Sequence, residues 1–274
     1  MEIEGPALVT GASRGLGRAV ALELARCGFD VLATMRSPEA GRDLPRLARE
    51  LEGTIAVERL DVRDPDSIRV PTGLQVLVNN AGVETAYLPV ETTPIEAWRE
   101  VFETNVFGVV ETLRRALPEL GQRNRAVVCN VTSASLLFPM PFYAVYRASK
   151  AALAALGESL QAEMQAHGVR VVEVMPGPVE TDMLAGSRRV PEAAAHEGYG
   201  ALAQWAWQGR QAAEGAKTPA DAAARRIVAA ILDDGAPLRV ACDPVGEGMI
   251  AGADAAPYEA RLRGALDAMR SGEE

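Results

Sequence analysis

Two residues in the run Tyr-Arg-Ala-Ser-Lys, Tyr146 and Lys150, have types and a spacing that indicate chemistry. Four residues apart on a helix, they share one face and their side chains are within reach of each other. A free phenol has a pKa of about 10, and a nearby ammonium group favours the phenolate and lowers that pKa. Such a pair suits proton exchange with an alcohol or carbonyl oxygen while a hydride moves to or from a cofactor.

Lysine is scarce in this chain, which makes the pair informative. Of the 28 lysines and arginines only Lys150 and Lys217 are lysines, and there are five tyrosines. A lysine four residues after a tyrosine therefore rarely arises by chance here. A compact ammonium in an arginine-rich chain also indicates a position that a planar guanidinium would not fill equivalently.

A glycine-rich run from Thr10 to Gly17 reads Thr-Gly-Ala-Ser-Arg-Gly-Leu-Gly and lies between an apolar strand and a helix. Glycine lets the backbone turn sharply and approach a pyrophosphate, and the free N–H groups at the helix start face the anion. In this context the run predicts dinucleotide binding rather than a plain tight turn.

The end of the second predicted strand, Thr34-Met35-Arg36, bears on the choice between NAD(H) and NADP(H). An NAD enzyme would place a carboxylate there, about 20 residues after the glycines, to hold the ribose diol. No carboxylate is present, and Arg36 together with Arg14 could bind a 2′-phosphate from two sides. We therefore expect NADP(H) to be preferred, with NAD(H) possible. The alternative is that both arginines are solvated surface charges.

Short apolar runs alternate with longer segments of helical period, as in parallel strands covered on both faces by crossover helices. We predict strands near 7–10, 30–35, 55–60, 75–79, 126–131, 169–175 and 238–242. We predict helices over 15–27, 41–51, 94–120, 143–167, 219–232 and 257–269. The fold class is then α/β, a doubly wound, mostly seven-stranded parallel sheet of order 3-2-1-4-5-6-7. Its ligand crevice lies at the carboxyl ends of the strands.

The chain has no internal repeat, low-complexity tract or linker, so we expect one dinucleotide-binding oxidoreductase domain over 1–274. Segment 183–218 has mixed polarity and is expected to form a substrate lid over the crevice, and a C-terminal tail begins near 243. Thr218 is expected to cap a helix that begins at Pro219. The stretch 65–72 leaves room for about two helical turns between the third and fourth strands.

These motifs, T-G-x-x-x-G-x-G followed by Tyr-x-x-x-Lys, resemble the short-chain dehydrogenase/reductase family over nearly the whole chain. The resemblance implies a catalytic tetrad of Asn105, Ser133, Tyr146 and Lys150. In it the serine donates to the substrate oxygen and the asparagine holds a water near the lysine. Thr132 and Ser135 are near alternatives to Ser133, and each serine has the alternative role of a turn residue.

The resemblance also implies a set of cofactor contacts at the ends of the predicted strands. They are Gly11, Ser13, Arg14, Gly15, Leu16, Gly17, Arg36, Asp61, Val62, Asn80, Ala81, Gly82, Tyr146, Lys150, Pro176, Gly177, Val179 and Thr181. Asn79, which directly precedes the expected contact Asn80, is expected to tie the sheet together.

Composition excludes several other functions. The formal net charge of −9 repels polyanions, so no nucleic-acid partner is expected. No apolar run approaches the roughly 18 residues of a membrane span, and the start of the chain has no signal-peptide pattern, so we expect a cytoplasmic protein. Two histidines and three cysteines without C-x-x-C spacing predict no metal site.

The segment 136–143 beside the predicted catalytic residues is apolar, which favours a small apolar carbonyl or alcohol substrate, although the same residues could simply pack under the helix. The substrate residues we predict are Phe138, Met140, Tyr143 and Trp205. The resemblance also implies that the chain forms a homodimer or homotetramer. The helices over 94–120 and 143–167 are the surfaces on which relatives assemble in this way. A cofactor-binding redox-sensing regulator without turnover is the main alternative function, and epimerase or dehydratase chemistry on the same fold is another.

Overall fold

Seven parallel strands form one sheet in the order β3-β2-β1-β4-β5-β6-β7, which confirms the predicted fold class. The computed structural model describes residues 1–123, 125–182 and 190–271. The strands are β1 (Ala7–Val9), β2 (Val31–Met35), β3 (Ile55–Arg59), β4 (Val76–Asn79), β5 (Ala126–Val131), β6 (Val169–Val174) and β7 (Arg239–Val240).

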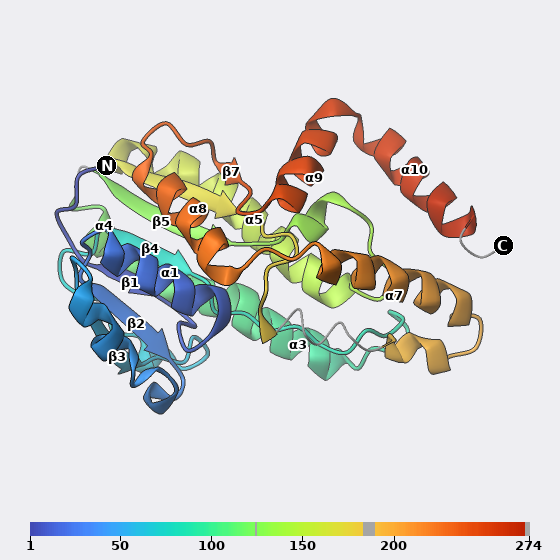
Figure 1. The fold of residues 1–274 in the computed structure, drawn as a ribbon, viewed down its shortest axis with the longest axis horizontal. Helices are drawn as coiled ribbons and strands as arrows, with labels where there is room; N and C mark the ends of the chain where they lie inside the picture. Colours follow the sequence, from blue (N-terminus) through green and yellow to red (C-terminus); the bar gives the residue numbers. More distant parts are fainter. Residues whose placement is uncertain (124, 183–189, 272–274) are drawn as a thin grey trace.

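Helices cover both faces of the sheet (Figure 1). The α-helices in the described ranges are α1 (Gly15–Arg26), α2 (Leu44–Leu47), α3 (Ile95–Phe102), α4 (Gly108–Leu120), α5 (Ala144–Met164), α7 (Gly200–Gly215), α8 (Ala220–Leu232), α9 (Pro244–Ala255) and α10 (Tyr258–Ser271). In Figure 1, α7, α9 and α10 gather at one end of the molecule, opposite the end that holds β3.

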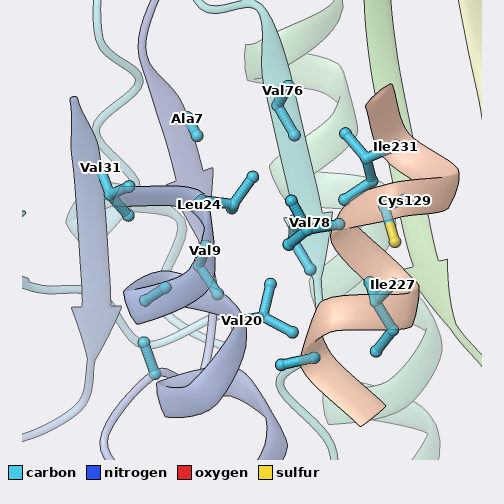
Figure 2. Packing of buried hydrophobic residues seen from close by; sticks show 14 of the residues in the cluster. Ala7, Val9, Val20, Leu24, Val31, Val76, Val78, Cys129, Ile227 and Ile231 are labelled. Carbon is cyan, nitrogen blue, oxygen red and sulfur yellow. The ribbon is translucent and has the colours of Figure 1, made fainter. Parts of the chain in front are cut away.

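Two apolar cores, one on each face, explain why the strands are nearly continuous apolar runs. In β1, Ala7 and Val9 pack against α1 and α8, whereas Leu8 belongs to the core under α4 and α5. Successive side chains of a strand point to opposite faces, so a strand buried on both sides needs apolar residues at every position. Figure 2 shows the first core, where the helix side chains are Val20, Leu24, Ile227 and Ile231.

The predicted helix over 94–120 is present from Ile95 to Leu120, but a π-helical turn at Glu103–Phe107 joins α3 to α4. Such turns often occur inside α-helices at functional sites. The turn buries Asn105, one of the predicted catalytic residues, completely. Asn105 therefore faces the interior of the protein beside α5 rather than solvent.

The segment 41–51 is not the single helix that was predicted. It contains the four-residue α2, between 3₁₀ turns at Pro38–Gly41 and Ala48–Glu50. Pro38 and Pro45 each lie in the first turn of a helix, the position at which the missing N–H is tolerated. Each proline thus starts a new turn instead of extending the previous one.

The connection between β3 and β4 is also thinner than the two turns that we expected. It holds only the 3₁₀ turn Pro65–Ser67. Directly after this turn, Ile68 packs with Leu60 and Val62 in a small separate apolar cluster.

The region after β6 contains helices that the sequence did not reveal. The described part of the expected lid, 190–218, holds a 3₁₀ turn at Glu192–Ala195 and the 16-residue α7. The remainder of the expected lid, 183–189, lies outside the described residues. The expected tail folds into α9 and α10, although only a helix over 257–269 was predicted.

Thr218 does not cap α8 as predicted. Its N–H donates to the Pro178 carbonyl (2.8 Å), and its own carbonyl accepts from the N–H of Glu180 (2.9 Å). These bonds make an isolated parallel bridge with Val179. The helix begins at Ala220, and its N-cap residue is Pro219.

Within the described residues no helix is long and apolar enough to span a membrane, and no group of three or more His, Cys, Asp or Glu side chains is placed to hold a metal ion. Cys129 and Cys242 are buried free thiols, whereas Cys27 is only half-buried.

Candidate active site

A cavity of about 690 Å³ lies along the carboxyl ends of the strands, where a doubly wound sheet binds its ligand. The structure brings every residue predicted to contact the cofactor to the wall of this cavity. They come from all along the chain: Gly11, Ser13, Arg14, Gly15, Leu16, Gly17, Arg36, Asp61, Val62, Asn80, Ala81, Gly82, Tyr146, Lys150, Pro176, Gly177, Val179 and Thr181. Ser133 also lines the cavity, whereas Asn105 lies behind its wall.

The glycine-rich loop between β1 and α1 has the shape that a phosphate cradle requires. Gly11 (φ 67°) and Gly15 (φ 54°) adopt left-handed backbone conformations, which glycine reaches without steric strain. A Cβ on Gly17 would lie 2.6 Å from the Gly11 carbonyl oxygen and nearer still to the Asn80 amide nitrogen. The loop therefore keeps a bare backbone at the start of α1, where an anion can approach the N–H groups.

Side-chain hydrogen bonds of Asn80 and Thr10 hold this loop in place. The Asn80 side-chain amide donates to the carbonyls of Thr10 (2.9 Å) and Gly11 (3.1 Å). The Thr10 hydroxyl accepts from the N–H groups of Asn80 and Ala81, both at 3.1 Å. Asn79 ties the sheet together as expected, because its amide donates to the Asn130 side chain of β5 (2.9 Å).

Three arginines that follow the first three strands line the cavity: Arg14 in the loop after β1, Arg36 directly after β2, and Arg63 after β3. Arg14 and Arg36 are both exposed there, and Arg14 forms an exposed ion pair with Asp182 (3.3 Å). The third is Arg63, which contacts Asp61 at 3.8 Å and which the sequence reasoning missed. Its signal was its place directly after the predicted Asp61-Val62 contact. Arg14 and Arg63 thus have acidic neighbours in Asp182, Asp61 and Glu100.

The segment after β6 is held in place by a buried carboxylate that we did not predict. Asp243 is fully buried and accepts hydrogen bonds from the N–H groups of Gly177 (2.6 Å) and Gly246 (2.9 Å). It thereby joins Gly177, one of the predicted cofactor contacts, to the first turn of α9. As a result, Val245 and Met249 of α9 also line the cavity.

Tyr146, Ser133 and Lys150 meet in the middle of the cavity. The Ser133 hydroxyl is hydrogen-bonded to the Tyr146 phenol. Lys150 is 4% exposed, donates to the Val131 carbonyl (2.7 Å), and has its Nζ 5.7 Å from the centroid of the Tyr146 ring. The side chain thus follows the same face of α5 as Tyr146, as the spacing of four predicts.

The geometry distinguishes Ser133 from the two alternatives. Thr132 donates to the buried Glu173 (3.1 Å) and to the Val174 carbonyl (3.0 Å), so it links β5 to β6. The Ser135 hydroxyl is buried and has no hydrogen-bond partner in the described part of the chain. Of the three hydroxyls, the one bonded to the Tyr146 phenol is that of Ser133.

Burial controls the ionisation of the tyrosine and the lysine. It raises the pKa of Tyr146 above the usual 10.0, with a smaller contribution from the charge of Glu84, and it lowers the pKa of Lys150 from 10.5 to about 8. The expectation of a phenol pKa below its usual value is therefore wrong for the protein chain by itself, because burial raises that pKa. At neutral pH Tyr146 is a protonated phenol and can serve as a proton donor.

Asn105 acts through its neighbours rather than from the cavity wall. Its side-chain amide accepts from the Val83 N–H (2.8 Å) and donates to the Val83 carbonyl (2.9 Å) and to the Ser149 hydroxyl (3.0 Å). Ser149 in turn donates to the Tyr146 carbonyl (2.7 Å). The asparagine thus fixes the loop after β4 against the helix turn that carries Tyr146.

The predicted substrate residues separate into two pairs. Met140 and Tyr143 line the cavity, and the Tyr143 ring stacks on Tyr146 with 4.8 Å between centroids. Phe138 and Trp205 stack on each other at 6.5 Å and are not among the lining residues. For that second pair the structure shows the packing of the expected lid onto the body.

A polar cluster that sequence reasoning missed lies beside Tyr143. The Tyr143 hydroxyl donates to Glu84 (2.8 Å), and the Arg210 guanidinium carbon lies 3.4 Å from the Tyr87 ring centroid and 5.0 Å from that of Tyr143. All four side chains line the cavity. Arg210 escaped notice because α7 was not predicted, so nothing in the sequence indicated which face of that segment would be buried.

The fold and the cavity together define a dinucleotide-dependent oxidoreductase, and comparisons with known proteins place it more narrowly. The sequence matches the short chain dehydrogenase family over residues 6–191. It is 39% identical over 192 residues to an uncharacterized oxidoreductase, YusZ, of Bacillus subtilis, covering 66% of this chain and 67% of that protein. It is 34% identical over 198 residues to 3beta-hydroxysteroid dehydrogenase 1 of Eggerthella lenta, covering 69% and 76%.

Two solved structures with bound cofactor are similar over most of their length. A short chain dehydrogenase from Burkholderia cenocepacia in complex with NADP has a TM-score of 0.74 and 28% identity, covering 97% of this chain and 99% of that one. A short chain dehydrogenase/reductase from Burkholderia phymatum in complex with NAD has a TM-score of 0.73 and 25% identity, covering 93% of each. The chain belongs to the short-chain dehydrogenase family, and it is an oxidoreductase of the type that acts on CH–OH and C=O groups with a nicotinamide cofactor.

Proposed function

We propose that this protein is an NADP(H)-dependent carbonyl reductase or alcohol dehydrogenase in which Tyr146 is the general acid and base. The observation that carries the proposal is the Tyr146 phenol, hydrogen-bonded to Ser133 and buried above Lys150 in the wall of a cavity shaped for a dinucleotide. The bare glycine backbone at the start of α1 supports the fit of a pyrophosphate in that cavity.

In the proposed reaction, a nicotinamide cofactor held by the glycine-rich loop and the segment after β6 would supply the hydride for the carbonyl carbon of the substrate, and the two π electrons of the C=O bond would move to the carbonyl oxygen. Ser133 and Tyr146 hold this oxygen, and the Tyr146 phenol transfers its proton to it, which completes the alcohol. The negative charge left on the phenol is stabilised by the nearby ammonium of Lys150. Oxidation of an alcohol is the same sequence in reverse.

A preference for NADP(H) over NAD(H) is supported by Arg14, Arg36 and Arg63 in the cavity wall, because guanidinium forms strong charge-assisted bonds with phosphate. The strand end that would carry the ribose-binding carboxylate of an NAD enzyme carries Arg36 instead. Cellular NADP pools usually drive reduction, so we propose reduction as the main direction.

The substrate we propose is a small carbonyl compound with an apolar body. The side chains of Met140, Val245 and Met249 support this, because they add apolar surface to the cavity wall. The described part of the expected lid, 190–218, is proposed to cover the cavity together with the helices after residue 243.

We further propose that the chain forms one domain and assembles as a homodimer or homotetramer through α4 and α5. The exposed apolar ring of Phe107, in the turn that starts α4, supports an interface on this side. A cytoplasmic location is proposed because Cys27, Cys129 and Cys242 are all free thiols, as expected in a reducing compartment.

Separate titrations with NADPH and NADH, followed by a screen of apolar ketones and aldehydes for cofactor oxidation, test the function. We expect turnover, with NADPH bound more tightly than NADH. Arg36→Ser should weaken NADPH binding by roughly 10- to 100-fold, the effect of losing a charge-assisted bond, and leave NADH binding unchanged. Arg42→Ser is the matched control, because Arg42 is a nearby exposed arginine outside the cavity wall.

Tighter binding of NADH than of NADPH would show that Arg14, Arg36 and Arg63 do not select the cofactor. NADPH binding without turnover of any carbonyl or alcohol would instead favour a redox-sensing regulator over an enzyme.

A further inference from the structure

We propose that Arg210 determines substrate specificity by binding an acidic group on the substrate, so that the preferred substrates are carbonyl compounds carrying a carboxylate, sulfonate or phosphate ester. This inference rests on the function proposed above and adds the class of substrate. It concerns a side chain of α7 that none of the predicted cofactor or catalytic contacts includes.

The first observation is that Arg210 is a buried charge in the cavity wall. Arg210 is 7% exposed, although arginine is almost never fully buried without a partner. Among residues 1–123, 125–182 and 190–271, Arg210 forms no ion pair within 4.0 Å, although the charge of Glu84 is near enough to interact with it. A buried cation without a contacting anion is costly, and a ligand that supplies the negative charge removes much of that cost.

The second observation is the orientation of the guanidinium. Its carbon lies 3.4 Å from the Tyr87 ring centroid, so one face of the planar group is covered by an aromatic ring. Guanidinium N–H bonds point outward in the plane of the group, away from a ring stacked on its face. The guanidinium is also hydrogen-bonded to the Tyr87 hydroxyl, so ring and hydroxyl together fix the arginine. Its remaining N–H donors can bind a two-oxygen anion.

Glu84, the acidic side chain of this cluster, is already engaged by phenols. Its carboxylate accepts from Tyr143 (2.8 Å) and is also hydrogen-bonded to Tyr87. The carboxylate thus spends its hydrogen bonds on the two phenols, and it interacts with Arg210 through charge and not through a contact ion pair. Glu84 acts here as a positioning residue that orients both rings.

The third observation is the position of the cluster relative to the reacting atoms. Tyr143 lies between Arg210 and the proposed acid, with 5.0 Å from the guanidinium carbon to its ring centroid and 4.8 Å from that centroid to the Tyr146 ring. A substrate whose acidic group meets Arg210 can thus present its carbonyl to Tyr146 across a few bonds. The apolar side chains of Met140 and Ala213 line the same cavity and can contact the connecting chain.

Paired substrates test the inference: 4-oxopentanoate, 5-oxohexanoate and 6-oxoheptanoate, each beside its methyl ester. We expect kcat/KM to favour the acid over the ester for at least one chain length. In Arg210→Met this ratio should fall roughly 10- to 100-fold, the effect of losing a charge-assisted bond, because kcat/KM falls more for the acid than for the ester. Arg210→Lys should retain part of the preference. Arg225→Met removes an exposed arginine of α8 that pairs with Asp221, and serves as the control.

Three results would overturn the inference and leave the proposed function standing. They are a preference for the esters at every chain length, an unchanged acid-to-ester ratio in Arg210→Met, and an equal loss for acid and ester, which would mean that Arg210 only holds α7 in place.

A binding measurement decides the inference even if no oxo acid or ester is turned over. Calorimetry with hexanoate and hexanamide on the protein–NADP⁺ complex should show tighter binding of hexanoate, lost at least about tenfold in Arg210→Met. Equal affinities of the acid and the amide would refute the anion site independently of catalysis.

Discussion

Replacing Tyr146 by phenylalanine should separate proton transfer from cofactor binding. The phenol oxygen is hydrogen-bonded to Ser133, whereas the ring stacks on Tyr143 at 4.8 Å and stays 5.7 Å from the Lys150 ammonium. Tyr146→Phe removes the oxygen and keeps the ring, so only one hydrogen bond and no buried volume is lost. We expect the free energy of unfolding to change by about 1 kcal/mol, and NADPH affinity to change by no more than that.

The rate should respond very differently. A positioned proton donor contributes about 10²- to 10⁴-fold, so kcat of Tyr146→Phe should fall by that factor. Steady-state rates at saturating NADPH, combined with a fluorescence titration of NADPH, measure both quantities on one preparation. Tyr199→Phe is the control, since it removes a phenol oxygen that bonds Glu91 outside the cavity wall. A variant that keeps kcat within tenfold of the parent, or loses NADPH binding in proportion to kcat, refutes the assignment.

Three further outcomes follow from the geometry of the site. Gly17→Ala should abolish NADPH binding in a protein that still folds, because the new methyl overlaps the Asn80 amide; unchanged affinity in the titration contradicts the cradle. Ser133→Ala should lower kcat more than Ser135→Ala in the steady-state assay, because Ser133 is the one bonded to the phenol; the reverse order would assign the role to Ser135. Lys150 has a pKa lowered from 10.5 to about 8 in the native state. Between pH values of about 8 and 10.5, the Lys150 amine is therefore still protonated in the unfolded chain but already neutral in the native chain. Unfolding free energies measured by denaturant should therefore rise with pH across this window, relative to Lys150→Met, by up to about 3 kcal/mol, and parallel pH profiles would contradict the shift.

The order and period of elements were readable from the sequence because strands buried on both faces need apolar residues at every position. In β1 and β4, runs such as Ala7-Leu8-Val9 leave no polar face, and right-handed crossovers then allow few sheet orders. The cofactor loop was readable for a similar reason. Gly11 and Gly15 have left-handed backbone conformations, and a Cβ at Gly17 would overlap neighbouring atoms, so these positions favour glycine over residues with a side chain.

The sequence could not decide the features that depend on which surfaces meet in space. The helix α7 carries small and mixed side chains with a weak period, and it is held by contacts such as that of Trp205 with Phe138 rather than by its own pattern. The burial of Arg210, its stacking on Tyr87 and its place near Tyr143 followed only once α7 was packed on the loop after β4.

The same division holds for the pair with which the sequence analysis began. Sequence alone determined that Tyr146 and Lys150 share a helix face, because that depends only on a spacing of four residues. The tertiary structure decided their ionisation. Burial by segments far away in the chain raises the pKa of Tyr146 and lowers that of Lys150, and desolvation depends on everything that surrounds a group rather than on its neighbours in sequence.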